Sequence, residues 1–351
     1  MTLGILKVFL PSVIAFTIGI LSTPLFTHFF YKYRLWKRVS RNENSDAMSP
    51  AFQKLHNVQH EVKTPRVGGI IIWFSVVLTI GILAIIDSVT NAPITERLNF
   101  ISRNQTLIPF AALIIGSIIG LFEDFLEIFA ARSSLFAQGL SSKYLVCIVL
   151  FVGFLAALWF YQKLGISQVY VPFVGYLEFG IGFIPFFMLV VFGTFSSRVI
   201  DGIDGLAGGV MAIAFAAYSV IALVQNQFDI AAFSLVVTGG ILAFLWFNIP
   251  PARFYMGETG MLGLTLTLAL IAFLTDGVFL LLIIGIMLVI TSLSSTIQIV
   301  SKKYFKKKIF LVAPIHHHFQ ALGWSREKIT MRYWIISIMM AVLGIVIAII
   351  G

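Results

Sequence analysis

The sequence predicts an all-α, polytopic membrane protein with about ten transmembrane helices, and two observations carry this prediction. Of its 351 residues, 59% are hydrophobic and only 11% are charged, whereas about a quarter of the residues in soluble domains are charged. The apolar residues also form long runs of about 17–25 residues, the length that a helix needs to cross a bilayer. No linker, internal repeat or low-complexity tract divides the chain, so residues 1–351 form a single predicted membrane domain.

Ten apolar runs are the predicted spans, and an even number places both termini on the same side of the membrane. The first run is longer than the core of a signal peptide and a basic cluster follows it, so we expect it to remain as a span. The runs cover residues 3–31, 68–87, 107–125, 144–161, 180–196, 208–224, 230–247, 260–275, 278–300 and 333–350.

Positive charge predicts the orientation of these spans, because cytoplasmic loops retain Lys and Arg. Twenty of the 24 Lys and Arg residues fall on one set of alternating loops, and only Lys7, Arg97, Arg103 and Lys163 fall on the other. The termini are therefore predicted to face outward. The net charge of +9 fits cytoplasmic loops that face anionic headgroups, and no nucleic-acid-binding module is recognisable.

The predicted outer loops are mostly short and offer little room for a site. The exception is residues 162–179, where aromatic and β-branched residues surround a turn that contains Pro172 and Gly175. This pattern predicts a small interfacial hairpin with a structural role. Cys147, the only cysteine, lies within a predicted span, which leaves no disulfide framework and no cysteine zinc site.

The clearest candidate site is Asp201-Gly202-Ile203-Asp204-Gly205, which joins two apolar runs at the membrane edge. Asp201 and Asp204 would share one face if this segment began a helix, whose first N–H groups favour anionic groups. The glycines let a ligand approach the backbone closely. Alternatively, Asp204 only caps the next span and the glycines only pack helices. This stretch alone leaves both interpretations open.

Further polar groups lie on the same predicted side. Glu123 and Asp124 end one apolar run, and adjacent carboxylates in a membrane protein usually bind a cation or act as a base. Alternatively, Glu123 simply faces headgroup water. Lys143 follows in the same loop, and Lys63 lies in a polar strip of the first loop, for which solvation is the simplest interpretation.

Two later loops add an amide, an aromatic residue, a carboxylate and histidines: Asn248, Tyr255 and Glu258, then His316-His317-His318 after Pro314. Three consecutive histidines cannot all point one way, which makes them a poor zinc site but suitable donors to phosphate or sugar oxygens. One side of the membrane thus collects ligands typical of Mg²⁺ and of phosphates, which indicates phosphoryl transfer. A transporter or flippase would place carboxylates near mid-span.

These motifs follow the order found in a known family over nearly the whole chain. The sequence resembles the polyprenyl-phosphate N-acetylhexosamine-1-phosphate transferases, and most of all their phospho-N-acetylmuramoyl-pentapeptide transferase branch. The matching stretches are residues 201–207, residues 247–248 with 256–260, and, most specifically, residues 313–319 with Gly323-Trp324.

The resemblance implies ten spans and a cytoplasmic active site in the bacterial plasma membrane. It also implies Mg²⁺-dependent transfer of a sugar-1-phosphate, N-acetylmuramoyl-pentapeptide-1-phosphate in the closest branch, from a UDP-sugar to undecaprenyl phosphate in peptidoglycan synthesis, with release of UMP. A homodimer through lipid-facing spans is implied as well. The alternative mechanism is a covalent intermediate on a carboxylate.

Carried over by position, Glu258 is the Mg²⁺ ligand, and Glu123 and Asp124 meet the lipid phosphate, whose proton either could accept. With Asp201, these three are the catalytic residues that the resemblance implies. The remaining positions are implied to bind substrate. Asp201, Gly202, Ile203 and Asp204 line the nucleotide pocket, Lys63 and Tyr255 hold uracil, and Asn248, Lys143, His316, His317 and His318 contact the diphosphate or the sugar.

The chain departs from the family's pattern at several of these positions. Glu123 and Glu258 stand where the family has Asp, so each carboxylate reaches one methylene further. Phe195 and Arg198 stand at the spacings of paired Asn residues, and Glu127 stands where the branch tends to have Lys.

The strip of residues 63–69 is more similar to the N-acetylglucosamine branch. Three alternatives therefore accompany the main prediction, namely a UDP-N-acetylglucosamine-type transferase, a catalytically weakened relative and a transporter.

Overall fold

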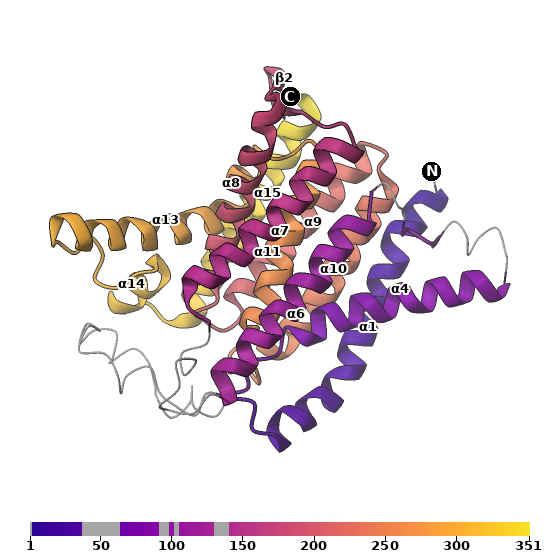
Figure 1. Cartoon of the computed structure of the whole chain (residues 1–351). Coiled ribbons are helices and arrows are strands. Elements are labelled where there is room, and N and C mark those ends of the chain that lie inside the picture. The colour runs from indigo at the N-terminus through magenta and orange to yellow at the C-terminus, as the bar shows by residue number, and fades with distance from the viewer. Residues whose placement is uncertain (1, 37–63, 91–97, 102–104, 130–139) are drawn as a thin grey trace.

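The computed structural model describes residues 2–36, 64–90, 98–101, 105–129 and 140–351, and in this part the chain is almost entirely helical. Most of the helices run along one direction, and both termini lie at the same end of the molecule (Figure 1). The predicted all-α class is confirmed. The side of the membrane that this end faces remains a prediction. The predicted site residue Lys63 lies outside the described residues.

Nine helical segments of the described part are long and apolar enough to cross a membrane. One of them, Gly180–Ile200, is the helix α8 extended at both ends by short 3-10 turns. The helices are α1 (Thr2–Lys32), α4 (Ile70–Thr90), α6 (Leu107–Phe129), α7 (Ser142–Lys163), α8 (Phe183–Ser196), α9 (Leu206–Val224), α10 (Phe228–Asn248), α11 (Gly257–Leu274) and α15 (Arg326–Ile350).

The predicted span at residues 278–300 is interrupted in the structure and is therefore not among these nine unbroken helices. It divides at Gly285 into α12 (Leu281–Ile284) and α13 (Ile286–Val300). Glycine is a poor helix former, and the backbone at Gly285 departs from helical geometry, with φ −91° and ψ 21°. As a result α13 projects sideways from the bundle, and α4 also runs across the common direction (Figure 1).

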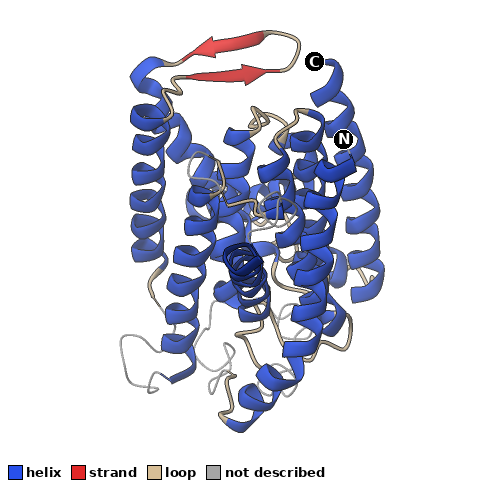
Figure 2. Ribbon diagram, turned by 90° about the vertical axis from the view of Figure 1, so that its right-hand side faces the viewer, coloured by secondary structure: helices blue, strands red, loops and turns tan. Residues whose placement is uncertain are grey.

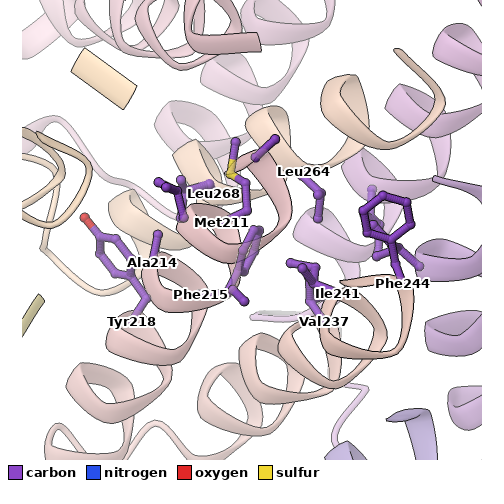
Figure 3. Packing of buried hydrophobic residues seen from close by; sticks show 14 of the residues in the cluster. Met211, Ala214, Phe215, Tyr218, Val237, Ile241, Phe244, Leu264 and Leu268 are labelled. Carbon is purple, nitrogen blue, oxygen red and sulfur yellow. The ribbon is translucent and has the colours of Figure 1, made fainter. Parts of the chain in front are cut away.

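The core of the bundle is built from α9, α10 and α11. In their apolar windows 72%, 78% and 89% of the residues are buried, against 22% in α1 and α15, so most of the surface of these three helices is covered by protein. Met211 and Phe215 of α9, Val237 and Ile241 of α10, and Leu264 of α11 lie in one packed cluster (Figure 3). Such dense packing fixes the ends of these helices, where the polar residues lie.

The predicted hairpin is confirmed, whereas its position on the outer side remains a prediction. Strands β1 (Gln168–Val171) and β2 (Gly175–Glu178) pair antiparallel at the end of the molecule that carries both termini (Figure 2). The backbone N–H of Phe173 and the hydroxyl of Tyr170 both donate to the carbonyl of Gly351. The hairpin is therefore bonded to the last residue of α15's segment, Gly351.

Candidate active site

The first turn of α11 gathers carboxylates from two remote segments. The N–H of Gly257 donates to Asp201 Oδ2 (3.2 Å), and the N–H groups of Glu258 and Thr259 donate to Asp124 Oδ1 (3.2 Å) and Oδ2 (2.8 Å). The hydroxyl of Thr259 also donates to Asp124 Oδ2 (2.6 Å). The first N–H groups of a helix lack partners within the helix and attract negative charge, so this helix end brings Asp124 and Asp201 beside Glu258.

Gly257 makes this arrangement sterically feasible. Its φ is +69°, a left-handed conformation that favours glycine. A Cβ at this position would lie 2.0 Å from the carbonyl oxygen of Arg66 and 2.5 Å from Asp124 Oδ2. Only glycine therefore lets the Arg66 backbone, Asp124 and α11 meet at one point.

Glu258 is already paired with a cation. Its Oε1 accepts a hydrogen bond from Arg198 Nη1, and the guanidinium of Arg198 lies 4.8 Å from the ring centroid of Phe195. Its Oε2 is buried and has no hydrogen-bond partner among the described residues. Three positions at which the chain departs from the family pattern are thus in direct contact with one another.

A second ion pair lies on the other side of Asp124. Arg66 Nη1 is 3.3 Å from Glu127 Oε2, and one carboxylate oxygen each of Glu123, Asp124 and Glu127 lies within 4.8 Å of the others. Asp124 is 1% exposed and Glu123 6% exposed. Arg66 therefore places positive charge beside this cluster, close to where the branch tends to have Lys in place of Glu127.

The loop that carries Asp201 and Asp204 precedes α9 and is not helical, which corrects the assumption that it begins a helix. Asp204 does not cap α9 either, because the capping position is Gly205. Instead, Asp204 Oδ2 accepts the N–H of Ala252 (3.1 Å), and its backbone carbonyl accepts the hydroxyl of Thr330. Asp204 thus fixes this loop against two other segments.

Asn248 binds the same loop from the end of α10. Its amide oxygen accepts the N–H of Gly205 (2.9 Å), and its amide nitrogen donates to the carbonyl of Phe254 (2.8 Å). The side chain is 4% exposed. Both the oxygen and the nitrogen of the Asn248 amide are therefore bonded to backbone groups.

The three histidines lie on a short helix, α14 (Ile315–Ala321), rather than in a loop. Consecutive helical residues point about 100° apart, so the histidines divide. A Cβ on Gly202 would lie 2.6 Å from His316 Nε2 and 2.9 Å from His317 Nε2, which places both rings against the backbone beside Asp201. His318 instead accepts the N–H of Leu311 at Nδ1 (3.2 Å).

The other predicted site residues differ in how the structure places them. Ile203 is buried in the loop between the two aspartates. Tyr255 is fixed through its backbone to Pro65 and Gly68, in the segment that follows Lys63. Lys143 is exposed at the start of α7 and forms no ion pair with any described residue.

Electrostatics at Asp201 oppose its ionisation. Desolvation raises the pKa of its carboxyl from 3.8 to about 6, although the guanidinium of Arg66 and the N–H of Gly257 oppose this shift. The charge of Glu258 adds to the increase. A cation beside Asp201 and Glu258 would relieve the repulsion.

Asp201 and Glu258 offer oxygen ligands of the kind that Mg²⁺ prefers, and Glu123, Asp124 and Glu127 form a neighbouring acidic group that could hold a metal ion. Mg²⁺ prefers carboxylate oxygens and usually takes only one or two of them. Asp201 and Glu258 supply such oxygens, and the buried Glu258 Oε2, which has no hydrogen-bond partner among the described residues, is an acceptor that calls for a donor or a cation. The other oxygen of Glu258 is bonded to Arg198 Nη1.

Three residues of this site carry no role in the sequence-based prediction. Arg66 and Arg198 form the two ion pairs, and Thr259 donates twice to Asp124. Arg198 stands out in the sequence only as a departure from the family's Asn, and that departure was the one available signal. Nothing in the sequence indicates which carboxylate an arginine will reach.

Comparison with known proteins identifies the family of the chain. Residues 106–276 match the family described as glycosyl transferase family 4, a range that includes Asp124, Asp201 and Glu258. The chain is 33% identical over 339 residues to the phospho-N-acetylmuramoyl-pentapeptide-transferase of Bacillus pumilus (strain SAFR-032), covering 95% of each chain. It is also 33% identical over 336 residues to the enzyme of that name from Bacillus subtilis (strain 168), covering 94% of each. The chain belongs to the phospho-N-acetylmuramoyl-pentapeptide-transferase family.

Proposed function

We propose that this chain transfers phospho-N-acetylmuramoyl-pentapeptide from its UDP derivative to undecaprenyl phosphate in the bacterial plasma membrane, releasing UMP. Family membership supports the reaction class. The observation that carries the proposal is the meeting of Asp124, Asp201 and Glu258 at one helix end, beside Gly202 and the histidines that pack on it. The site lies at the ends of apolar helices, where a lipid phosphate and a soluble nucleotide can both reach it.

In the proposed reaction an oxygen of the lipid phosphate attacks the sugar-linked phosphorus of the UDP-sugar. The bond from that phosphorus to the bridging oxygen breaks, and the oxygen leaves with UMP. Because both oxygens of Asp124 hold the first turn of α11, we assign Asp124 to positioning. Glu123 is then the carboxylate assigned to the lipid phosphate, which is itself largely ionised near neutral pH, so placement matters more than proton removal.

Asp201 and Glu258 are the residues that would hold Mg²⁺, which supplies neutralisation of diphosphate charge when bound. Asp201 Oδ2 accepts the N–H of Gly257, the residue before Glu258. The loop of Gly202 and Ile203 would follow the nucleotide, with His316 and His317 donating to diphosphate or sugar oxygens. Tyr255 and Lys63 are proposed for uracil, and Lys143 for the diphosphate.

The test is UMP release by purified protein given undecaprenyl phosphate, Mg²⁺ and one UDP-sugar at a time. Release with UDP-N-acetylmuramoyl-pentapeptide alone is the expected result. Release with UDP-N-acetylglucosamine alone would move the chain to the other branch. No release from a folded protein with any sugar would make it a weakened relative.

Two variants sharpen this test. Asp201→Asn should lose UMP release, whereas Asp276→Asn should retain it, because Asp276 lies in the loop that follows α11 and bonds to Tyr176 of the hairpin. Omitting the lipid phosphate separates the mechanisms. A single displacement then releases no UMP, whereas a covalent carboxylate intermediate would release up to one equivalent.

A further inference from the structure

Arg198 occupies the carboxylate that the proposed function assigns to Mg²⁺. Its Nη1 donates to Glu258 Oε1, and its side chain is 19% exposed while that of Glu258 is 22% exposed. The residue lies in the 3-10 turn Ser197–Ile200, directly before Asp201. One cation therefore stands at the junction of the two segments that carry Asp201 and Glu258.

The aromatic ring of Phe195 packs against the face of the Arg198 guanidinium. The ring is 3% exposed, and the guanidinium carbon of Arg198 lies 4.8 Å from its centroid, within the range of a cation–π contact. This contact leaves the planar edge of the guanidinium for anions. That edge can bind a carboxylate or a phosphate with two parallel hydrogen bonds.

Charge balance limits what can approach this helix end. Asp124, Asp201 and Glu258 are three carboxylates, and the diphosphate of a UDP-sugar would add further negative charge. The charge of Arg66 acts on Asp201 from an ion pair with Glu127, whereas Arg198 is bonded directly to Glu258. A diphosphate that binds here would compete with Glu258 for the guanidinium of Arg198.

We propose that Arg198 is a diphosphate-binding residue whose resting partner is Glu258, and that it exchanges Glu258 for the diphosphate of the nucleotide sugar. This proposal rests on the proposed function, because it names the group that binds the same substrate. It predicts that Arg198 weakens the binding of a cation and strengthens the binding of the nucleotide. Without nucleotide, Arg198 competes with a divalent cation for Glu258, and with nucleotide it strengthens binding of the diphosphate.

The test measures binding rather than turnover, with Mn²⁺, UDP and UMP as probes. In Arg198→Gln, the Kd for Mn²⁺ without nucleotide should fall by about tenfold, because a charge-assisted hydrogen bond no longer competes. The Kd for UDP should rise by about tenfold while the Kd for UMP changes much less. Arg198→Lys, which keeps the charge, should lie between wild type and Arg198→Gln.

The matched control is Arg253→Gln. Arg253 also stacks on a phenylalanine, with its guanidinium 5.4 Å from the centroid of Phe247, but it pairs with no carboxylate among the described residues. This variant should leave the Kd for Mn²⁺ and the ratio of the UDP and UMP constants unchanged. In the double variant Arg198→Gln with Glu258→Gln the gain in Mn²⁺ affinity should disappear, which ties it to this ion pair.

Unchanged or weaker Mn²⁺ binding in a folded Arg198→Gln protein would overturn the competition. Equal losses for UDP and UMP would overturn the contact with the diphosphate. Neither measurement needs UMP release. If the wild-type protein releases no UMP but Arg198→Gln shows both shifts in Kd, the proposed function is refuted and this inference stands.

Discussion

At the scale of single residues, Asp201 links stability to the proposed chemistry. Its carboxyl has a pKa of about 6 instead of 3.8 because it is desolvated. A raised carboxyl pKa stabilises the folded state below the unfolded pKa, and this stability is lost as the pH rises toward 6. At pH 8 the ionised Asp201 therefore destabilises the metal-free fold.

Asp201→Asn should consequently raise the melting temperature of the metal-free protein at pH 8. The variant does not titrate, so its advantage over wild type should grow by about 1 kcal/mol between pH 5 and pH 8. Thermal unfolding in detergent with a chelator at both pH values measures this difference. An advantage that is equal at both pH values would show that Asp201 does not carry the raised pKa.

The side-chain length of Glu258 should be critical for activity. Glu258→Gln should abolish UMP release and raise the Kd for Mn²⁺ by at least tenfold, because a neutral amide replaces the charged ligand. Glu258→Asp should be impaired because its shorter side chain no longer reaches the position set by Arg198. We expect Glu123→Asp to rescue it in part, and wild-type activity in Glu258→Gln would remove Glu258 from the metal site.

At the scale of elements, the first turn of α11 is the unit that assembles the site. Gly257→Ala should destabilise the protein by about 2 kcal/mol or more, because the new Cβ meets the Arg66 carbonyl in a left-handed backbone. Gly165→Ala is the matched control. Gly165 has a φ of +67°, and a Cβ built there has no neighbouring atom within 4 Å. Its substitution therefore costs only the strain of the left-handed backbone.

Thermal unfolding of these two variants separates the close approach at Gly257 from its conformation. The destabilisation at Gly257 should exceed that at Gly165. Equal changes in melting temperature would mean that Arg66, Asp124 and α11 are not held as tightly as the geometry indicates.

At the scale of the whole molecule, the division of polar and basic residues between the two ends gives a topology to test. In a Cys147→Ala background, Val174→Cys in the hairpin should react in intact cells with a maleimide that cannot cross the membrane. Lys307→Cys in the last basic segment should react only after the cells are opened. The reverse pattern would invert the predicted orientation and move the site outside.

The sequence by itself determined the class of the fold and most of its elements. Runs of apolar residues must form helices in a bilayer, because the hydrocarbon offers no partner for backbone groups, so length and hydropathy were sufficient to predict the spans. They were not sufficient at residues 278–300. There the local backbone at Gly285 breaks the helix, and hydropathy does not register such a break.

The resemblance of the sequence's motifs also pointed to Asp124, Asp201 and Glu258, which the structure brings together at the first turn of α11. Only the tertiary structure decided how they are used. Hydrogen bonds and ion pairs form between segments far apart in the chain, so the sequence could not tell that Asp124 holds the first turn of α11 or that His318 serves Leu311. For the same reason the two departures at Arg198 and Glu258, separate in sequence, were revealed as one ion pair only by the fold.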